Sequence, residues 1–321
     1  MKRMVSILVA ILFLLIFPLS VFANSKTLMN EIKINEWENY KKISSMNDNE
    51  LLSKGYSEAQ ISKIRSFNYE EEIRFRANLP DEKLVLYGYT KEEIDELRAA
   101  AALKEIPESV MKSISTSTMT SSLKYLRNGS YSVLERPMYY VDLEYTWSWK
   151  RIPYFTVVDM VAVAFNSSGS ESYVYTSVSG YNVRADLIAI ESGYSNRTQV
   201  EPWVWDTSKA NSVSASFAVA IKNNDRTITH FAYNGTGRLR LENRSNNGRL
   251  YIDAAYGHTT INIYPTYSLD LSGGSVSLNF KIGMDEQHCA GVFLEDFTIR
   301  LADVYHGTIW GKNGTGGTNR K

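Results

Sequence analysis

The sequence predicts an α+β protein, with a small helical N-terminal module followed by an antiparallel β-sandwich or jelly-roll domain. Three observations predict this class. A helical pattern repeats at a spacing of 33 residues in the first third of the chain, and apolar and polar residues alternate from about residue 137 onward. Turn signals also recur between the alternating runs. A closed barrel is the main alternative for the β part, because it shares this pattern.

The first 23 residues have the composition of a secretory signal peptide. Lys2 and Arg3 precede an apolar run, and Val21-Phe22-Ala23 offers small residues where a signal peptidase reads. We expect cleavage at this point, a mature chain that begins near Asn24, and secretion to the extracellular space. An uncleaved anchor is the alternative, but the apolar run is short for a membrane span.

Composition limits the partners that the chain is suited to bind. Removal of the leader leaves 298 residues with 33 basic and 35 acidic side chains, so the balance of charge gives no electrostatic case for a nucleic-acid ligand or an anionic membrane. Cys289 is the single cysteine, which excludes a disulfide within the chain. A secreted eukaryotic protein of this size would usually carry several cysteines, so we expect a bacterial, Gram-positive protein.

The repeat in the helical part aligns Asp48–Arg65 with Asp81–Arg98. We predict that each copy is a helix-turn-helix hairpin, in which a glycine in the left-handed conformation ends the first helix and a capping box starts the second. These positions are Gly55, Ser57 and Gln60 in the first copy, and Gly88, Thr90 and Glu93 in the second. Tyr56 and Tyr89 precede the caps and are expected to pack across the turn.

The repeat resembles paired Gly-Tyr-Ser/Thr helical hairpins of uncharacterised secreted proteins from Gram-positive bacteria. The resemblance covers about a fifth of the chain and implies no activity. We interpret the helical part as a packing or spacer unit, and the alternative is a partner-binding module with Tyr56 and Tyr89 as the contact candidates.

Composition also predicts the domain boundaries. Residues 30–108 carry 17 acidic and 12 basic side chains, whereas Ser113–Ser122 is rich in serine and threonine and has few core-forming residues, as in a linker. We therefore predict a signal peptide at 1–23, a helical module at 24–110, a linker at 111–136, a β-sandwich at 137–305 and a flexible tail at 306–321. Long strands are expected at 139–149, 155–165, 213–221 and 276–282.

No catalytic motif is present, so we expect a non-enzymatic protein without a cofactor. His288 and Cys289 are adjacent and would point to opposite faces of a strand, and the four histidines have no metal-binding spacing, so no metal site is predicted. Asp142 and Glu144 would share one face of a strand, which allows a glycan-cleaving enzyme as a third hypothesis. Surface charge on the solvent side is the simpler explanation of that pair.

Aromatic residues provide the remaining candidates for a binding site. Trp203 and Trp205 form a Trp-x-Trp pair beside Pro202, in a segment that resembles a loop, and together with Tyr194 they are the predicted ligand-binding residues. The alternative is that the tryptophans belong to the core.

We predict a secreted binding protein whose partner is an extracellular glycan, a cell-wall polymer or another protein. A membrane-active or pore-forming protein is the alternative. The amphipathic segments Tyr173–Ser179 and Ser212–Ala220 are the candidates for membrane contact, which is possible but not favoured.

Overall fold

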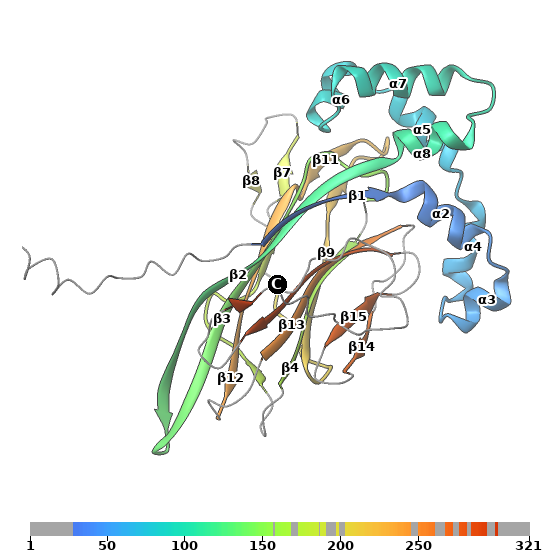
Figure 1. Ribbon diagram of the computed structural model, residues 1–321. Helices are drawn as coiled ribbons and strands as arrows, with labels where there is room; N and C mark the ends of the chain where they lie inside the picture. The colour runs from blue at the N-terminus through green and yellow to red at the C-terminus, as the bar shows by residue number, and fades with distance from the viewer. Residues whose placement is uncertain are drawn as a thin grey trace, which may run out of the picture.

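The computed structural model describes residues 28–156, 158–167, 173–185, 187–190, 197–198, 203–244, 250–260, 267–271, 276–280, 284–293 and 299–300. The predicted leader and tail lie outside these residues. Within them, helices occupy the N-terminal part and antiparallel strands dominate the remainder, which confirms the predicted α+β class (Figure 1).

The two copies of the repeat form two helical hairpins, α3–α4 and α6–α7. Gly55 and Gly88 have positive φ angles of 78° and 89°. Both capping boxes are formed, Ser57 with Gln60 and Thr90 with Glu93, so the predicted local geometry is confirmed. The helices of the described N-terminal part are α2 (Glu36–Ser44), α3 (Asp48–Ser53), α4 (Glu58–Ser66), α5 (Tyr69–Ala77), α6 (Asp81–Leu86), α7 (Lys91–Ala102) and α8 (Glu108–Ile114).

Each copy of the repeat has an ion pair that joins the two helices of its hairpin, at equivalent positions in the two copies. Arg65 of α4 lies 2.8 Å from Asp48 of α3, and Arg98 of α7 pairs with Asp81 of α6. The arginines also donate to backbone carbonyls, Arg65 to Ser44 and Arg98 to Leu79. The pairs are solvent-exposed, so they orient the helices and add little stability.

The strands that the structure describes form two large sheets and two small ones. One large sheet has the order β1-β2-β3-β12-β5, with β6 also paired to β12, and the other has the order β17-β16-β13-β4-β9. The strands are β1 (Leu28–Asn35), β2 (Thr116–Val133), β3 (Arg136–Trp149), β4 (Val158–Ser167), β5 (Val174–Thr176), β6 (Val183–Ala185), β7 (Leu187–Ala189), β8 (Arg197–Thr198), β9 (Ser212–Ala218), β10 (Ala220–Lys222), β11 (Ile228–Phe231), β12 (Asn234–Asn243), β13 (Leu250–Thr259), β14 (Tyr267–Asp270), β15 (Ser277–Phe280), β16 (Met284–Phe293) and β17 (Ile299–Arg300).

Aromatic side chains fill the space between the two large sheets. The ring of Trp147 on β3 lies 5.3 Å from that of Phe217 on β9 and 5.5 Å from that of Tyr256 on β13. Gly235 of β12 is the register partner of Trp147, and a Cβ atom there would lie 2.1 Å from the indole. The absence of a side chain at Gly235 therefore makes room for the indole of Trp147.

The structure corrects two predicted boundaries. The segment 111–136 is not a linker: α8 ends at Ile114, and β2 then runs through the Ser/Thr-rich stretch to Val133. Polar side chains at alternate positions suit one face of a sheet, which is why this composition also fits a strand. The segment 24–110 is not wholly helical, because β1 precedes α2 and pairs with β2.

The helical part shares one continuous core with the β-sandwich. The guanidinium of Arg76 is buried, donates to the carbonyls of Ile152 and Pro153 at 2.9 Å, and lies 4.2 Å from the ring of Tyr154. The hydroxyl of Tyr87 accepts a bond from the backbone N–H of Ile228 on β11. These contacts fix the helices on β11 and on the connection between β3 and β4.

Candidate functional site

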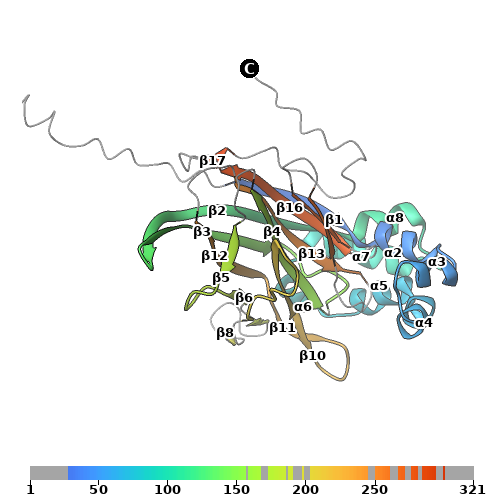
Figure 2. The same ribbon diagram turned by 90° about the horizontal axis from the view of Figure 1, so that it is seen from below.

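The β2–β3 hairpin extends beyond the strands that flank it. β1 pairs with β2 from Thr116 to Leu123, and β12 pairs with β3 from Tyr139 to Ser148. Residues 124–130 continue past β1, and residues 131–138 continue past both neighbours and project from the body of the protein in two perpendicular views (Figures 1 and 2). We call residues 131–138 the hairpin tip.

The turn at the tip has an unusual sequence for its geometry. Val133 pairs with Arg136, so the loop has two residues, Leu134 and Glu135, with φ angles of 50° and 66°. Two-residue loops with both φ angles positive are normally built from Asn-Gly or related pairs, because a Cβ atom is strained in this conformation. The turn therefore holds a branched apolar side chain in a conformation that disfavours it.

The tip exposes apolar side chains. Leu134 is 93% exposed, and the neighbouring Tyr131 and Val133 are 41% and 42% exposed. Tyr131 lies near Tyr140 across the hairpin, with 6.4 Å between the ring centroids. An isolated exposed leucine is common, but three such side chains at the end of a projecting hairpin form a contact surface.

A charged cluster holds the base of the hairpin. The Asp142 carboxylate on β3 is fully buried and accepts hydrogen bonds from Arg240 at 2.7 and 2.8 Å, Arg127 at 2.8 Å and Tyr181 at 2.9 Å. The Arg240 guanidinium also lies 3.9 Å from the ring of Tyr140. Because these groups come from β2, β3, β12 and the segment before β6, the cluster ties the hairpin to the sheet.

The same cluster bears on the hypothesis of glycan cleavage by Asp142 and Glu144. Burial alone would raise the pKa of Asp142, but the hydrogen bonds from Arg240, Arg127 and Tyr181 outweigh it and hold the pKa below the ordinary value of 3.8. Glu144 pairs with Arg238 at 2.7 Å. A glycosidase needs a carboxyl group that keeps its proton near neutral pH, and Asp142 does not meet this requirement.

Of the predicted ligand-binding residues, the two tryptophans do not form an exposed platform. Trp205 is 4% exposed, and its indole N–H donates to the carbonyl of Arg238 at 2.7 Å. Trp203 is partly buried and packs against Phe217 with 5.4 Å between the ring centroids. Trp205 therefore belongs to the core, which was the alternative to a binding role. Tyr194 lies outside the described residues.

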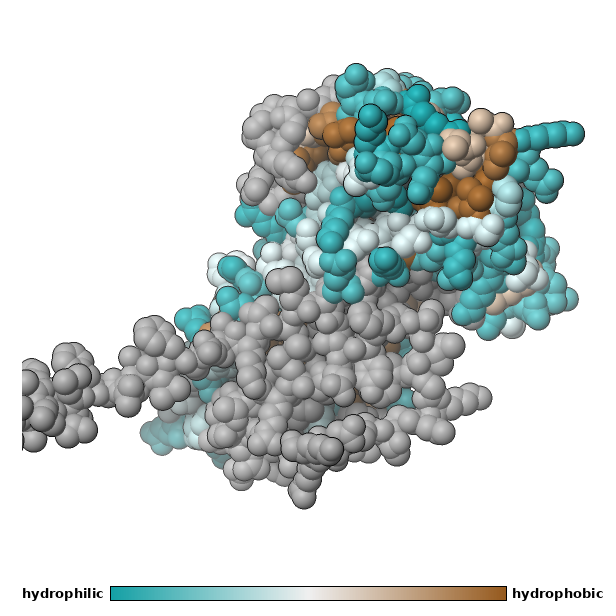
Figure 3. All heavy atoms as spheres, turned by 45° about the horizontal axis from the view of Figure 1, so that its top comes forward, coloured by the Kyte–Doolittle hydropathy of each residue, from teal (hydrophilic) through white to brown (hydrophobic). Residues whose placement is uncertain are grey.

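The tyrosines of the helical repeat are also buried. Tyr56 and Tyr89 are 2% and 4% exposed, and the ring of Tyr89 lies 4.6 Å from the Arg151 guanidinium. Neither ring is available to a partner in this conformation. Leu52 and Val85, which occupy equivalent positions in the two copies, are exposed instead. Much of the helical surface seen in Figure 3 is hydrophilic, with two apolar areas.

The segments expected to contact a membrane are parts of the sheets. Residues 174–176 form β5 on the edge of β12, and Ser212–Ala218 form β9, which pairs with β4. The β2–β3 hairpin was not among the predicted features, because residues 111–136 were expected to be a linker. Met119, Leu123 and Tyr125 lie at odd-numbered positions between polar residues, and this spacing was the signal that could have revealed β2.

No helix within the described ranges has the length and apolar character to cross a bilayer. Among the same residues, no group of three or more His, Cys, Asp or Glu side chains is arranged to hold a metal ion. Nothing is described of the side chains of His288 and Cys289, which lie on β16.

Comparison with known proteins does not assign a family. No family model matches the chain, and no curated protein matches it. Two similar solved structures are a "Pore forming protein", with 10% identity and a TM-score of 0.26, and the Clostridium perfringens NetB toxin in the membrane inserted form, with 9% identity and a TM-score of 0.24. Each covers 58% of this chain, and the covered shares of those chains are 89% and 94%. Such low scores do not establish a common fold.

Proposed function

We propose that this chain is a secreted, non-enzymatic binding protein that attaches to a lipid membrane through the tip of its β2–β3 hairpin. The observation that carries the proposal is the turn itself, where Leu134 is 93% exposed at a φ angle of 50°. A turn that served stability alone would carry Asn-Gly. The apolar side chain is therefore the property that this turn offers to a partner.

The residues around Leu134 suit the membrane interface. Tyrosine combines an apolar ring with a polar hydroxyl and is enriched where a membrane meets water, and Val133 adds apolar area. Glu135 and Arg136 balance each other in charge, so the turn does not require an anionic headgroup. Full transfer of a leucine side chain from water to an apolar phase is worth about 1.5–3 kcal/mol. Insertion of Leu134 alone would thus change the affinity by about tenfold or more.

The hairpin also holds the tip away from the body of the protein. The Asp142 cluster fixes its base, and the strands beyond the cluster carry the tip past β1 and β12. A glycan, a cell-wall polymer or another protein is the alternative partner, and the indole of Trp205, which lies in the core, gives that alternative no support.

The test is co-sedimentation of the mature chain with vesicles of phosphatidylcholine and of phosphatidylcholine mixed with phosphatidylglycerol. We expect the native chain to sediment with both kinds of vesicle. The affinity of the Leu134→Asn variant for vesicles should be about tenfold lower. Val204→Ser is the matched control, because Val204 is 80% exposed and lies far from the hairpin in sequence. If Leu134→Asn and Val204→Ser lose the same amount of vesicle binding, attachment through the tip is excluded. It is also excluded if the native chain does not sediment with vesicles.

A further inference from the structure

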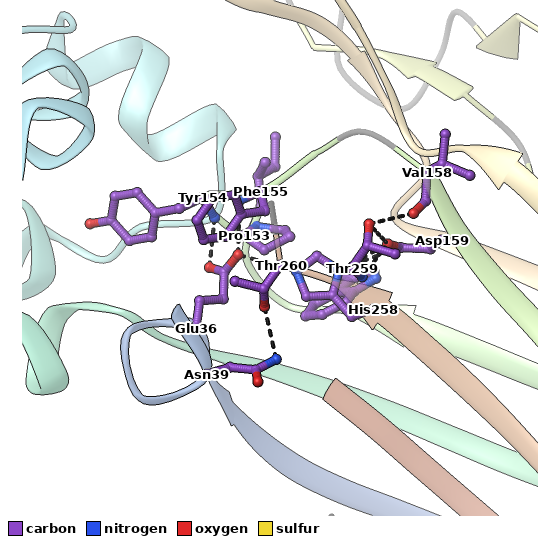
Figure 4. A network of polar contacts seen from close by, with 12 residues as sticks. Glu36, Asn39, Pro153, Tyr154, Phe155, Val158, Asp159, His258, Thr259 and Thr260 are labelled. Atoms are coloured by element: carbon purple, nitrogen blue, oxygen red, sulfur yellow. Dashed lines mark hydrogen bonds and ion pairs between the residues drawn. The ribbon is translucent and has the colours of Figure 1, made fainter. Parts of the chain in front are cut away.

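A buried histidine lies between two carboxylates where the N-terminal segment meets the sandwich. His258 is near the end of β13, its Nδ1 atom is 3.0 Å from Asp159 of β4, and its Nε2 atom is 3.1 Å from Glu36, the first residue of α2. All three side chains are at most 1% exposed. Figure 4 shows how they converge from segments far apart in the sequence.

The two carboxylates are fixed by further hydrogen bonds. Glu36 accepts the backbone N–H groups of Tyr154 and Phe155 at 2.7 and 2.8 Å. Asp159 accepts the hydroxyl of Tyr256 at 2.6 Å and the backbone N–H of Thr259 at 3.0 Å. Asp159 is thus held within its own sheet, whereas Glu36 belongs to a different part of the chain.

The surroundings of His258 favour its charged form. The ring of Trp149 lies 5.0 Å away, and Asp285 of β16 is the backbone register partner of His258. Burial alone would lower the pKa of His258, but the charges and hydrogen bonds of Asp159 and Glu36 hold it well above the ordinary value of 6.5. With the proton in place, one positive group separates two negative ones.

Glu36 connects this cluster to an edge strand. We define the N-terminal segment as residues 28–44, which comprise β1 and α2. β1 pairs with β2 from Thr116 to Leu123, so it covers that edge of the sheet. Asn39 of α2 supports the same junction through a 3.0 Å hydrogen bond to Thr260.

We propose that Glu36, His258 and Asp159 form a charge-dependent latch that holds the N-terminal segment over the edge of β2. Loss of the proton from His258 leaves two buried carboxylates without a cation between them, which is strongly unfavourable. Asp159 is a residue of β4 and is bonded within its own sheet, whereas Glu36 is joined to the sandwich only through side-chain contacts, so Glu36 is the group that leaves, with loss of its bonds from Tyr154 and Phe155. The N-terminal segment then separates from β2, while β4 and β13 stay paired.

The test is hydrogen exchange of the intact mature chain followed by mass spectrometry between pH 6 and 9, with protection factors corrected for the intrinsic rate. Below pH 6.5 the latch is closed. Above it, we expect the protection of residues 28–44 to fall by up to about tenfold per pH unit until the pKa of His258 is reached. Residues 158–167 and 250–259 should keep their protection over the same range.

Three variants separate the latch from general instability. His258→Gln and Glu36→Gln should each lower the protection of residues 28–44 already at pH 6 and remove most of its dependence on pH. Glu38→Gln is the matched control, because Glu38 is an exposed residue of α2 that pairs with Lys112, and it should behave like the native chain. If the His258→Gln variant does not fold, the pH dependence of protection in the native chain and in the Glu36→Gln variant tests the proposal. Protection that is independent of pH, or lost simultaneously in residues 28–44, 158–167 and 250–259, would overturn the proposal.

Discussion

Replacement of Leu134-Glu135 by Asn-Gly should make the protein more stable and at the same time weaken its binding to membranes. The left-handed conformation costs an ordinary residue about 1–2 kcal/mol, and Asn and Gly adopt it more readily. Part of this gain is lost because glycine increases the conformational entropy of the unfolded chain by about 0.5–1 kcal/mol. We therefore expect a net increase of about 1–2 kcal/mol in the free energy of unfolding.

The stability is measured by urea unfolding and the affinity by vesicle co-sedimentation, both on the mature chain. The urea midpoint should rise, and for a chain of this size Tm should rise by roughly 2–3 °C. The affinity for vesicles should fall about tenfold, because Asn does not enter the apolar phase. If the variant is less stable than the native chain, the proposed strain in the turn is wrong. If its affinity for vesicles is unchanged, the proposed role of Leu134 in membrane binding is wrong.

Three other predictions concern the body of the protein. Gly235→Ala should lower the free energy of unfolding by about 1–3 kcal/mol, because its Cβ would lie 2.1 Å from Trp147, and unchanged thermal stability would contradict that packing. Asp142→Asn should cost about 3 kcal/mol in urea unfolding because it leaves Arg240 without its buried partner, whereas Glu144→Gln, beside a half-exposed arginine, should cost less than 1 kcal/mol. Finally, the pKa of His258 is raised in the folded protein, so its contribution to stability is complete below pH 6.5 and is lost as the pH rises through the folded pKa. Urea midpoints that do not fall from pH 6 to 9 would exclude this contribution.

Local features of the fold could be predicted from the sequence. Gly55, Gly88 and the two capping boxes depend on residues within a few positions of one another, and the structure has them as expected. The strand at 139–149 followed from its alternation, because one face of β3 is buried.

Features that depend on distant contacts could not be predicted. The Ser/Thr-rich stretch becomes β2 because β1 and β3 supply its hydrogen-bond partners from both sides. Glu36 and His258 are 222 positions apart, and no pattern in the sequence connects them. Trp205 is in the core because the carbonyl of Arg238 satisfies its indole N–H.

Attachment to membranes through the tip can be measured with an environment-sensitive fluorophore at Leu134. A nitrobenzoxadiazole group is attached at Leu134→Cys in a Cys289→Ser background, and the same label at Val204→Cys is the control. On addition of vesicles, we expect a blue shift and quenching by a lipid-phase quencher at position 134 and no change at position 204. An unchanged spectrum at position 134, or the same shift at both positions, would contradict attachment through the tip.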